Sequence, residues 1–238
     1  MTTVSEDLAA LAESTHRLMD TLEAMRPEQV AEPSQLPGWT RGHVIAHLAR
    51  NADALSNLLI GARLGERRAM YPSPEARERD IETGSKRPLD EQLDDLRSAC
   101  GRFVESVSLV PESGWDFLVP HRTGPDFAVR TVPHKRIKEV EYHHVDLGLG
   151  YRPKDWPADF VAEELAELLA RYEKDDRFPA MLLTDAASGA EHRIGGEGGA
   201  PERIAGAPAD LLAWLSGRSS GEGLSVPPAA LPPVPPML

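Results

Sequence analysis

The chain has 238 residues, 41% of them hydrophobic and 27% charged, a composition typical of a globular protein with one large domain or two small ones. Its formal net charge of -12 argues against nucleic acid as the main partner, because binding to phosphates needs clustered Lys and Arg. The sequence contains neither an apolar run of about eighteen residues nor the pattern of a signal peptide, so we expect a cytoplasmic protein without membrane contacts.

Amphipathic helices are expected in the first part of the chain. Apolar residues recur at every third or fourth position between residues 5 and 26, and again between 88 and 108. Thr40 is suited to cap a second helix, and a fourth helix is expected from about Thr131 to Gly148, where the glycine suits the C-terminal cap. Four such helices predict a bundle, a fold in which metal sites are built from inward-facing side chains.

The pattern of the sequence changes after residue 150. We expect a helix over 157–172, short strands at 179–185, 191–196 and 202–206, and a helix over 208–215. The predicted fold class is therefore α+β, with a four-helix bundle in residues 1–150 and a smaller α+β domain in residues 151–238. The proline-rich tail that begins at Val226 is expected to be either an extended strap or a disordered end.

Residues able to bind a metal occur on the second and fourth predicted helices. His47 lies about 20° from the apolar stripe of its helix and should face the bundle interior, whereas His43 lies about 60° away. Glu139 and His143 are four residues apart, so they project from one helix face. Two imidazoles and one carboxylate, with a fourth position left open, are typical of a catalytic zinc site.

Other interpretations of these residues stay open from spacing alone. Glu139 and His143 could form an exposed helical pair, and the histidine on the second helix could be a hydrogen-bonded core residue. Glu141 and His144 have the Glu-x-x-His spacing of di-iron bundles. The first and third helices offer no suitable inward-facing glutamate for such a site, so a mononuclear site is favoured.

The single cysteine limits the thiol chemistry of the chain. Cys100 excludes an internal disulfide framework and a thiolate-rich zinc site, and we expect it to be a small buried core residue. If the protein uses a thiol, that thiol is therefore expected to come from outside the chain.

Several segments resemble one known family. LPGWTRGHVIAHLARNADAL (residues 36–55) and KEVEYHHVDLG (138–148) are similar to the motifs of the mycothiol-dependent maleylpyruvate isomerases. Residues 70–85 and 206–220 resemble the same family in the same order, so the likeness extends over nearly the whole chain. The resemblance implies a DinB-like metal-binding bundle followed by a sterol-carrier-like α+β domain.

The resemblance also implies a site and a reaction. It implies that His47, Glu139 and His143 bind zinc, and that Arg77 and Arg218 bind a dicarboxylate substrate, since Arg matches a carboxylate with two parallel hydrogen bonds. The implied reaction is the mycothiol-dependent cis–trans isomerisation of maleylpyruvate to fumarylpyruvate in aromatic catabolism. In this reaction the thiolate adds to the double bond, the resulting single bond rotates, and elimination regenerates the thiol.

Two alternative functions are kept open. A mycothiol S-transferase would join the thiol to an electrophile and stop before elimination. A non-catalytic metal-binding module would close the fourth coordination position, for which Glu141, His144 and Asp146 are the nearest candidates in the sequence.

Overall fold

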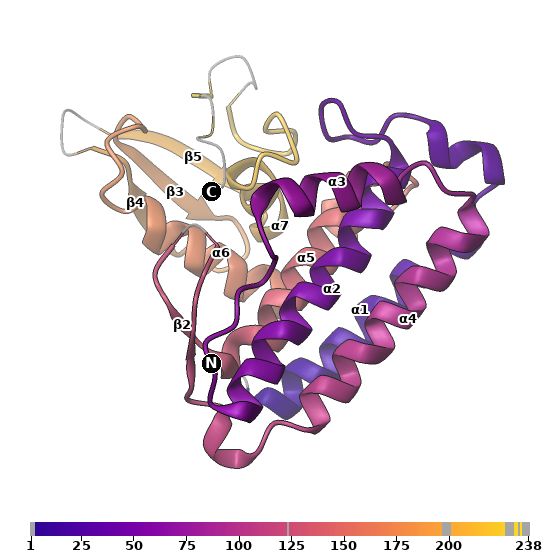
Figure 1. Cartoon of the computed structure of the whole chain (residues 1–238). Coiled ribbons are helices and arrows are strands. Elements are labelled where there is room, and N and C mark those ends of the chain that lie inside the picture. The colour runs from indigo at the N-terminus through magenta and orange to yellow at the C-terminus, as the bar shows by residue number, and fades with distance from the viewer. Residues whose placement is uncertain (1–2, 123, 197–200, 227–230, 233, 235–238) are drawn as a thin grey trace. The chain divides into compact units, whose positions relative to one another are not determined.

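A computed structural model describes residues 3–122, 124–196, 201–226, 231–232 and 234. The chain divides into two compact units, Met1–Leu149 and Gly150–Leu238 (Figure 1). Most of the proline-rich tail lies outside the described residues. None of the described helices is both long and apolar enough to cross a membrane.

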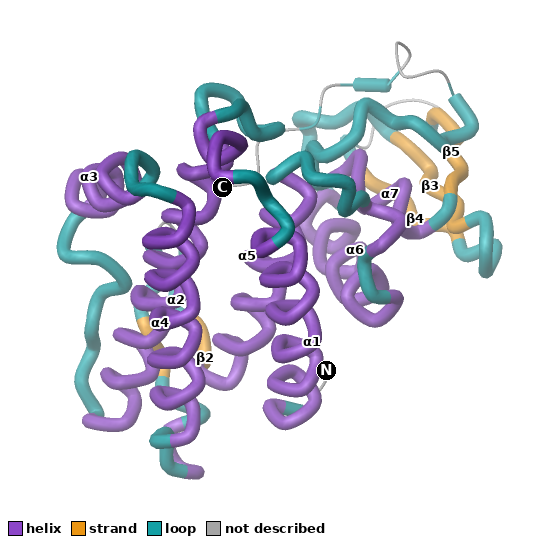
Figure 2. Tube along the Cα trace, turned by 90° about the vertical axis from the view of Figure 1, so that its right-hand side faces the viewer, coloured by secondary structure: helices purple, strands orange, loops and turns teal. Residues whose placement is uncertain are grey.

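The first unit is mainly helical. Its elements are α1 (Val4–Glu23), α2 (Arg41–Leu64), α3 (Pro74–Gly84), α4 (Leu89–Ser108), β1 (Leu118–Val119), β2 (Phe127–Ala128) and α5 (Val132–Asp146). Helix α2 packs against α4 and α5, and α5 packs against α1, which gives the expected bundle of four long helices (Figure 2). The interior is filled by aliphatic side chains that are almost fully buried, among them Leu18, Leu48 and Leu58.

Local signals in the sequence explain where these helices begin and end. Thr40 caps α2, because its hydroxyl accepts a hydrogen bond from the backbone N–H of His43. Gly65, with φ of 68°, ends the same helix in the left-handed conformation that glycine adopts without strain. Gly148, with φ of 66°, does the same just after α5. The caps expected from Thr40 and Gly148 are therefore confirmed.

Helix α3 was not expected from hydrophobic periodicity. Only Ile81 and Gly84 are buried in this helix, so its sequence has no apolar stripe to detect. Its start is nevertheless encoded, since the Ser73 hydroxyl accepts from the Ala76 N–H and Pro74 occupies the first helical position. Figure 1 shows that α3 lies across α2. The short hairpin formed by β1 and β2 was also not expected, because its sequence has no strong pattern either.

The second unit combines two helices with a small sheet. Its elements are α6 (Ala158–Tyr172), β3 (Met181–Asp185), β4 (Glu191–Ile194), β5 (Glu202–Gly206) and α7 (Pro208–Leu215). The sheet has the order β4–β3–β5, with β3 antiparallel to β4 and parallel to β5. Helix α6 packs against α7 and β4, over a core that includes Tyr172, Phe178 and Leu183. The expected α+β fold class is confirmed.

The contact between α2 and the end of α3 gives a prediction about stability. A Cβ atom added at Gly42 would lie 2.6 Å from the backbone oxygen of Ser85, so Gly42→Ala must push these segments apart. We expect a loss of about 1–3 kcal/mol in the free energy of unfolding, the usual result of overpacking. Gly101→Ala on α4 is the matched control, because nothing lies within 4 Å of its added Cβ.

Urea unfolding of the two variants provides the measurement. Gly101→Ala should raise the free energy of unfolding by roughly 0.5–1 kcal/mol, since alanine favours a helix interior over glycine. Equal stability of the two variants would show that α2 and Ser85 do not approach as closely as the structure indicates.

Candidate metal centre

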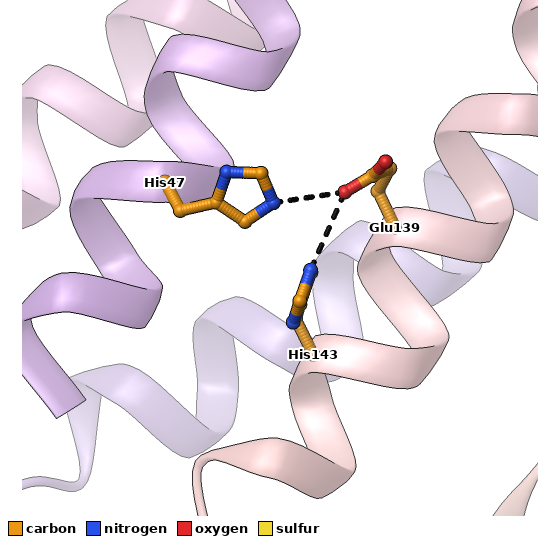
Figure 3. Close-up of side chains that lie close together, drawn as sticks. All are labelled: His47, Glu139 and His143. Atoms are coloured by element: carbon orange, nitrogen blue, oxygen red, sulfur yellow. Dashed lines mark hydrogen bonds and ion pairs between the residues drawn. The ribbon is translucent and has the colours of Figure 1, made fainter. Parts of the chain in front are cut away.

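Three side chains from two helices of the first unit point toward one another (Figure 3). Nε2 of His47, on α2, lies 3.0 Å from Oε2 of Glu139, on α5. Nε2 of His143, one turn further along α5, lies 3.4 Å from the same oxygen. All three donor atoms lie within 4.8 Å of one another. The structure thus brings together the three residues that the sequence predicted as ligands.

The packing of α2 against α5 explains why these side chains meet. Val44 and Leu48 flank His47 on α2, and Val140 lies beside Glu139 on α5; all three aliphatic side chains are fully buried. Burying them turns the ligand faces of the two helices toward each other. His47 is itself only 5% exposed, in agreement with the interior position expected from its angle on the helix.

The donor set fits a tetrahedral divalent ion. Zinc binds imidazole nitrogen and carboxylate oxygen at about 2.0–2.1 Å, which places tetrahedral donors about 3.3 Å apart. The two nitrogen–oxygen distances at Glu139, 3.0 and 3.4 Å, lie on either side of that value. The imidazoles of His47 and His143 are nearly perpendicular, at 87°, with centroids 4.6 Å apart, so they do not block each other.

Asp146 orients the His143 ring. Its Oδ2 lies 2.9 Å from Nδ1 of His143, and the side chain is only 2% exposed. Because a carboxylate only accepts, Nδ1 carries a proton in this contact, and Nε2 is the nitrogen directed at Glu139. Carboxylates that hold the outer nitrogen of a metal-binding histidine are common around zinc.

Burial and hydrogen bonds set the protonation of the three groups. Burial lowers the pKa of His47 to about 4, against a smaller opposite effect of its hydrogen bond to Glu139. Burial opposes ionisation of Glu139, but hydrogen bonds from His143 and His47 outweigh it and hold the pKa of this carboxyl well below its usual value. A neutral imidazole and an ionised carboxylate are the forms that bind metal.

His43 is occupied by other contacts. Its Nδ1 accepts from the backbone N–H of Thr40 at 3.1 Å, which leaves Nε2 as the protonated nitrogen. That nitrogen lies 3.0 Å from Oε2 of Glu82. Both ring nitrogens are therefore used, and this explains why His47, one turn further along α2, is the residue that faces Glu139.

Glu141 and His144 face a different neighbour. Arg17 of α1 lies 2.8 Å from Oε1 of Glu141, which also accepts from the Ser14 hydroxyl. Thr21, also on α1, lies 2.7 Å from Nε2 of His144. These contacts tie α1 to α5, so the pair with di-iron spacing takes part in helix packing.

Arg77 and two aromatic residues complete the surroundings of His47. Nη2 of Arg77, on α3, lies 3.3 Å from Nδ1 of His47, and its guanidinium lies over the Tyr71 ring at 5.7 Å from the centroid. The Trp39 ring lies edge to face with the His47 ring at 5.6 Å. Sequence reasoning missed Trp39 and Tyr71. Trp39 stands directly before the cap of α2, which was a usable signal, whereas Tyr71 precedes the helix that periodicity did not detect.

Arg218 belongs to the second unit, just beyond α7. Its backbone N–H donates to the Ala213 carbonyl at 2.7 Å, and Nη1 donates to the Ser216 carbonyl at 3.0 Å. The structure thus places Arg218 at the C-terminal end of a helix, and its part in substrate binding stays a prediction.

Family models match both units of the chain. The Mycothiol maleylpyruvate isomerase N-terminal domain matches residues 11–148, and the MDMPI C-terminal domain matches residues 155–233. The chain is 28% identical to a solved mycothiol-dependent maleylpyruvate isomerase, with a TM-score of 0.89 and full coverage of both chains. A histidine-to-alanine mutant of the mycothiol-dependent maleylpyruvate isomerase, also solved, matches over the same coverage with 28% identity and a TM-score of 0.88. No curated protein shows significant sequence similarity to this chain.

The opposite pKa shifts of the two histidines predict distinct titrations when a chelator is present. His47 should stay neutral until about pH 4, whereas hydrogen bonds to Asp146 and Glu139 outweigh burial and raise the pKa of His143 above 6.5. As the pH falls from 6.5 toward 4, the unfolded chain protonates His47 and the folded chain does not, so the folded state loses stability. The stability that His143 contributes is present below pH 6.5 and is lost as the pH rises through its raised pKa.

Ring-resolved NMR titration of the chelated protein measures both values. Titration of the two rings together near pH 6.5 would contradict the arrangement around Glu139.

Proposed function

Since this chain belongs to the mycothiol-dependent maleylpyruvate isomerase family, we propose that it converts maleylpyruvate to fumarylpyruvate with a thiol as co-substrate. The convergence of His47, Glu139 and His143 on one point is the observation that carries this proposal. The three residues lie on the two helices that contain both motifs of the family, and the two nitrogen–oxygen distances at Glu139 are close to the donor spacing of a tetrahedral zinc site.

The chain supplies three protein ligands and leaves a fourth position for a thiol. A bound zinc ion would act as a Lewis acid that lowers the pKa of a coordinating thiol, as it does for water. A closed, non-catalytic site is not favoured. Asp146 is held by Nδ1 of His143, while Glu141 and His144 are held by side chains of α1.

Arg77 is well placed to bind a substrate carboxylate next to the ligands. Arginine only donates, so Nδ1 of His47 acts as acceptor in their contact. When Nε2 of His47 is used for coordination, the ring proton resides on Nδ1, which then no longer accepts from Arg77. The guanidinium becomes available for a carboxylate, which it matches with two parallel hydrogen bonds. A second carboxylate is the predicted role of Arg218.

The proposed reaction balances without an external oxidant or reductant. The thiolate sulfur forms a bond to one carbon of the cis double bond, and the electron pair moves into the conjugated carbonyl as an enolate. The former double bond is now single and rotates. Return of the electron pair expels the sulfur and restores a double bond in the trans geometry. Arg77 would stabilise the negative charge that develops during addition.

An assay with zinc-loaded protein, mycothiol and maleylpyruvate tests the function. We expect fumarylpyruvate to accumulate while the total concentration of free thiol stays constant, because elimination regenerates the thiol. A chelator should abolish turnover. Accumulation of a stable thiol adduct with loss of free thiol would instead identify an S-transferase.

The ligand assignment is tested by His47→Ala. Removing one of three protein ligands should lower zinc retention after dialysis to a small fraction of the wild-type content, and turnover should fall with it. His16→Ala is the matched control, since this histidine is 78% exposed on α1. Metal analysis together with the isomerase assay gives the result. Full metal content in His47→Ala would show that His47 is not a ligand.

A further inference from the structure

A cavity of about 420 Å³ lies beside the candidate metal centre, within the first unit. It is formed by the segment that precedes α2, the first turn of α2 and residues 77–82 of α3. Its chemistry comes from the side chains of Trp39, His43, Arg77, Glu78, Arg79 and Glu82. The proposed reaction gives a role to Arg77 alone among these residues.

The cavity is adjacent to His47. Arg77 lines it and also lies 3.3 Å from His47, and Trp39 lines it and lies 5.6 Å from the His47 ring. His43, in the cavity wall, precedes His47 by one helical turn, a rise of about 5.4 Å. A ligand with one end at the metal centre can therefore extend into this cavity.

The charges of the lining cancel. The lining contains two guanidinium groups and two carboxylates, so its formal charges sum to zero. Glu78 and Arg79 make no side-chain hydrogen bond or ion pair with any other described residue, which leaves them available to a ligand. Glu78 and Glu82 would repel the second carboxylate of a dicarboxylate substrate, whereas hydroxyl groups can donate to carboxylates and accept from arginine.

Trp39 adds a flat apolar surface beside these charged groups. The indole is half-buried and lies nearly parallel to the His43 ring, at 26° and with centroids 6.1 Å apart. His43 is fixed in turn by Thr40 and Glu82, so the indole rests on a rigid support. An aromatic plane next to hydrogen-bonding groups suits a sugar ring, which has apolar C–H faces and a rim of hydroxyls.

We propose that this cavity binds the glucosaminyl-inositol part of mycothiol, while the cysteinyl sulfur of the same molecule reaches the metal centre. Trp39 packs on a face of the pseudo-disaccharide, and Glu78, Arg79 and Glu82 hydrogen-bond its hydroxyls. The inference rests on the proposed thiol-dependent function. It identifies the residues that would make the protein prefer mycothiol to thiols without a pseudo-disaccharide.

The test compares mycothiol with N-acetylcysteine amide, which keeps the neutral amide and lacks the pseudo-disaccharide. Both thiols are titrated into zinc-loaded protein by calorimetry, and the ratio of their dissociation constants is measured. In Trp39→Leu, the preference for mycothiol should fall about three- to tenfold, the loss expected for one aromatic contact. Trp115→Leu is the matched control, because Trp115 is also half-buried but does not line the cavity.

Glu78→Ala is a second variant. Because Glu78 is exposed, its substitution should not disturb folding, so it tests the cavity even if Trp39→Leu misfolds. This variant should also have a reduced preference for mycothiol, while its zinc content stays equal to that of the wild-type protein. If the wild-type protein binds and turns over with mycothiol but both variants keep its preference, the cavity assignment is overturned and the proposed function stands. If the wild-type protein does not bind mycothiol, the proposed function fails and this assignment fails with it.

Discussion

The packing of α2 against α5 is the interaction on which the candidate metal centre depends. It brings His47 to Glu139 across 92 positions of sequence, and a hydrogen bond fixes the same interface one turn away. There, Nη1 of Arg136 on α5 donates to Oδ1 of Asn51 on α2 at 2.8 Å. Arg136 is 1% exposed, and a charged group buried so deeply is tolerated only where its donors have partners. The separation of the two helices is therefore defined by polar as well as apolar contacts.

Helix α5 shows how one short segment serves two purposes. Glu139 and His143 face α2, whereas Glu141 and His144 face α1, where Arg17 and Thr21 hold them. Residues two apart on a helix differ by about 200° in direction, so alternate polar residues face different neighbours. Among the described residues, only the first of these two pairs meets a third side chain able to bind a metal, which distinguishes it from the pair that packs against α1.

The sequence predicted most of the architecture and part of the site, for identifiable reasons. Apolar periodicity located the long helices, and the angle of His47 on α2 distinguished it from His43. Periodicity could not choose between the two Glu and His pairs of α5, because that choice depends on which helix lies opposite each face. Only the family resemblance made it. Helix α3 was not predicted, because it buries few apolar residues. Tyr71, which lies under Arg77, and Trp39, which contacts His47, were identified only from the positions of α3 and of the segment before α2 in the structure.

X-ray absorption at the zinc edge, recorded before and after addition of mycothiol, is the most direct measurement of the central claim. The account predicts a first shell of nitrogen and oxygen donors at about 2.0–2.1 Å, which gains one sulfur at about 2.3 Å when the thiol binds. A purified protein that retains no zinc, or a zinc shell that acquires no sulfur at saturating mycothiol, would contradict it.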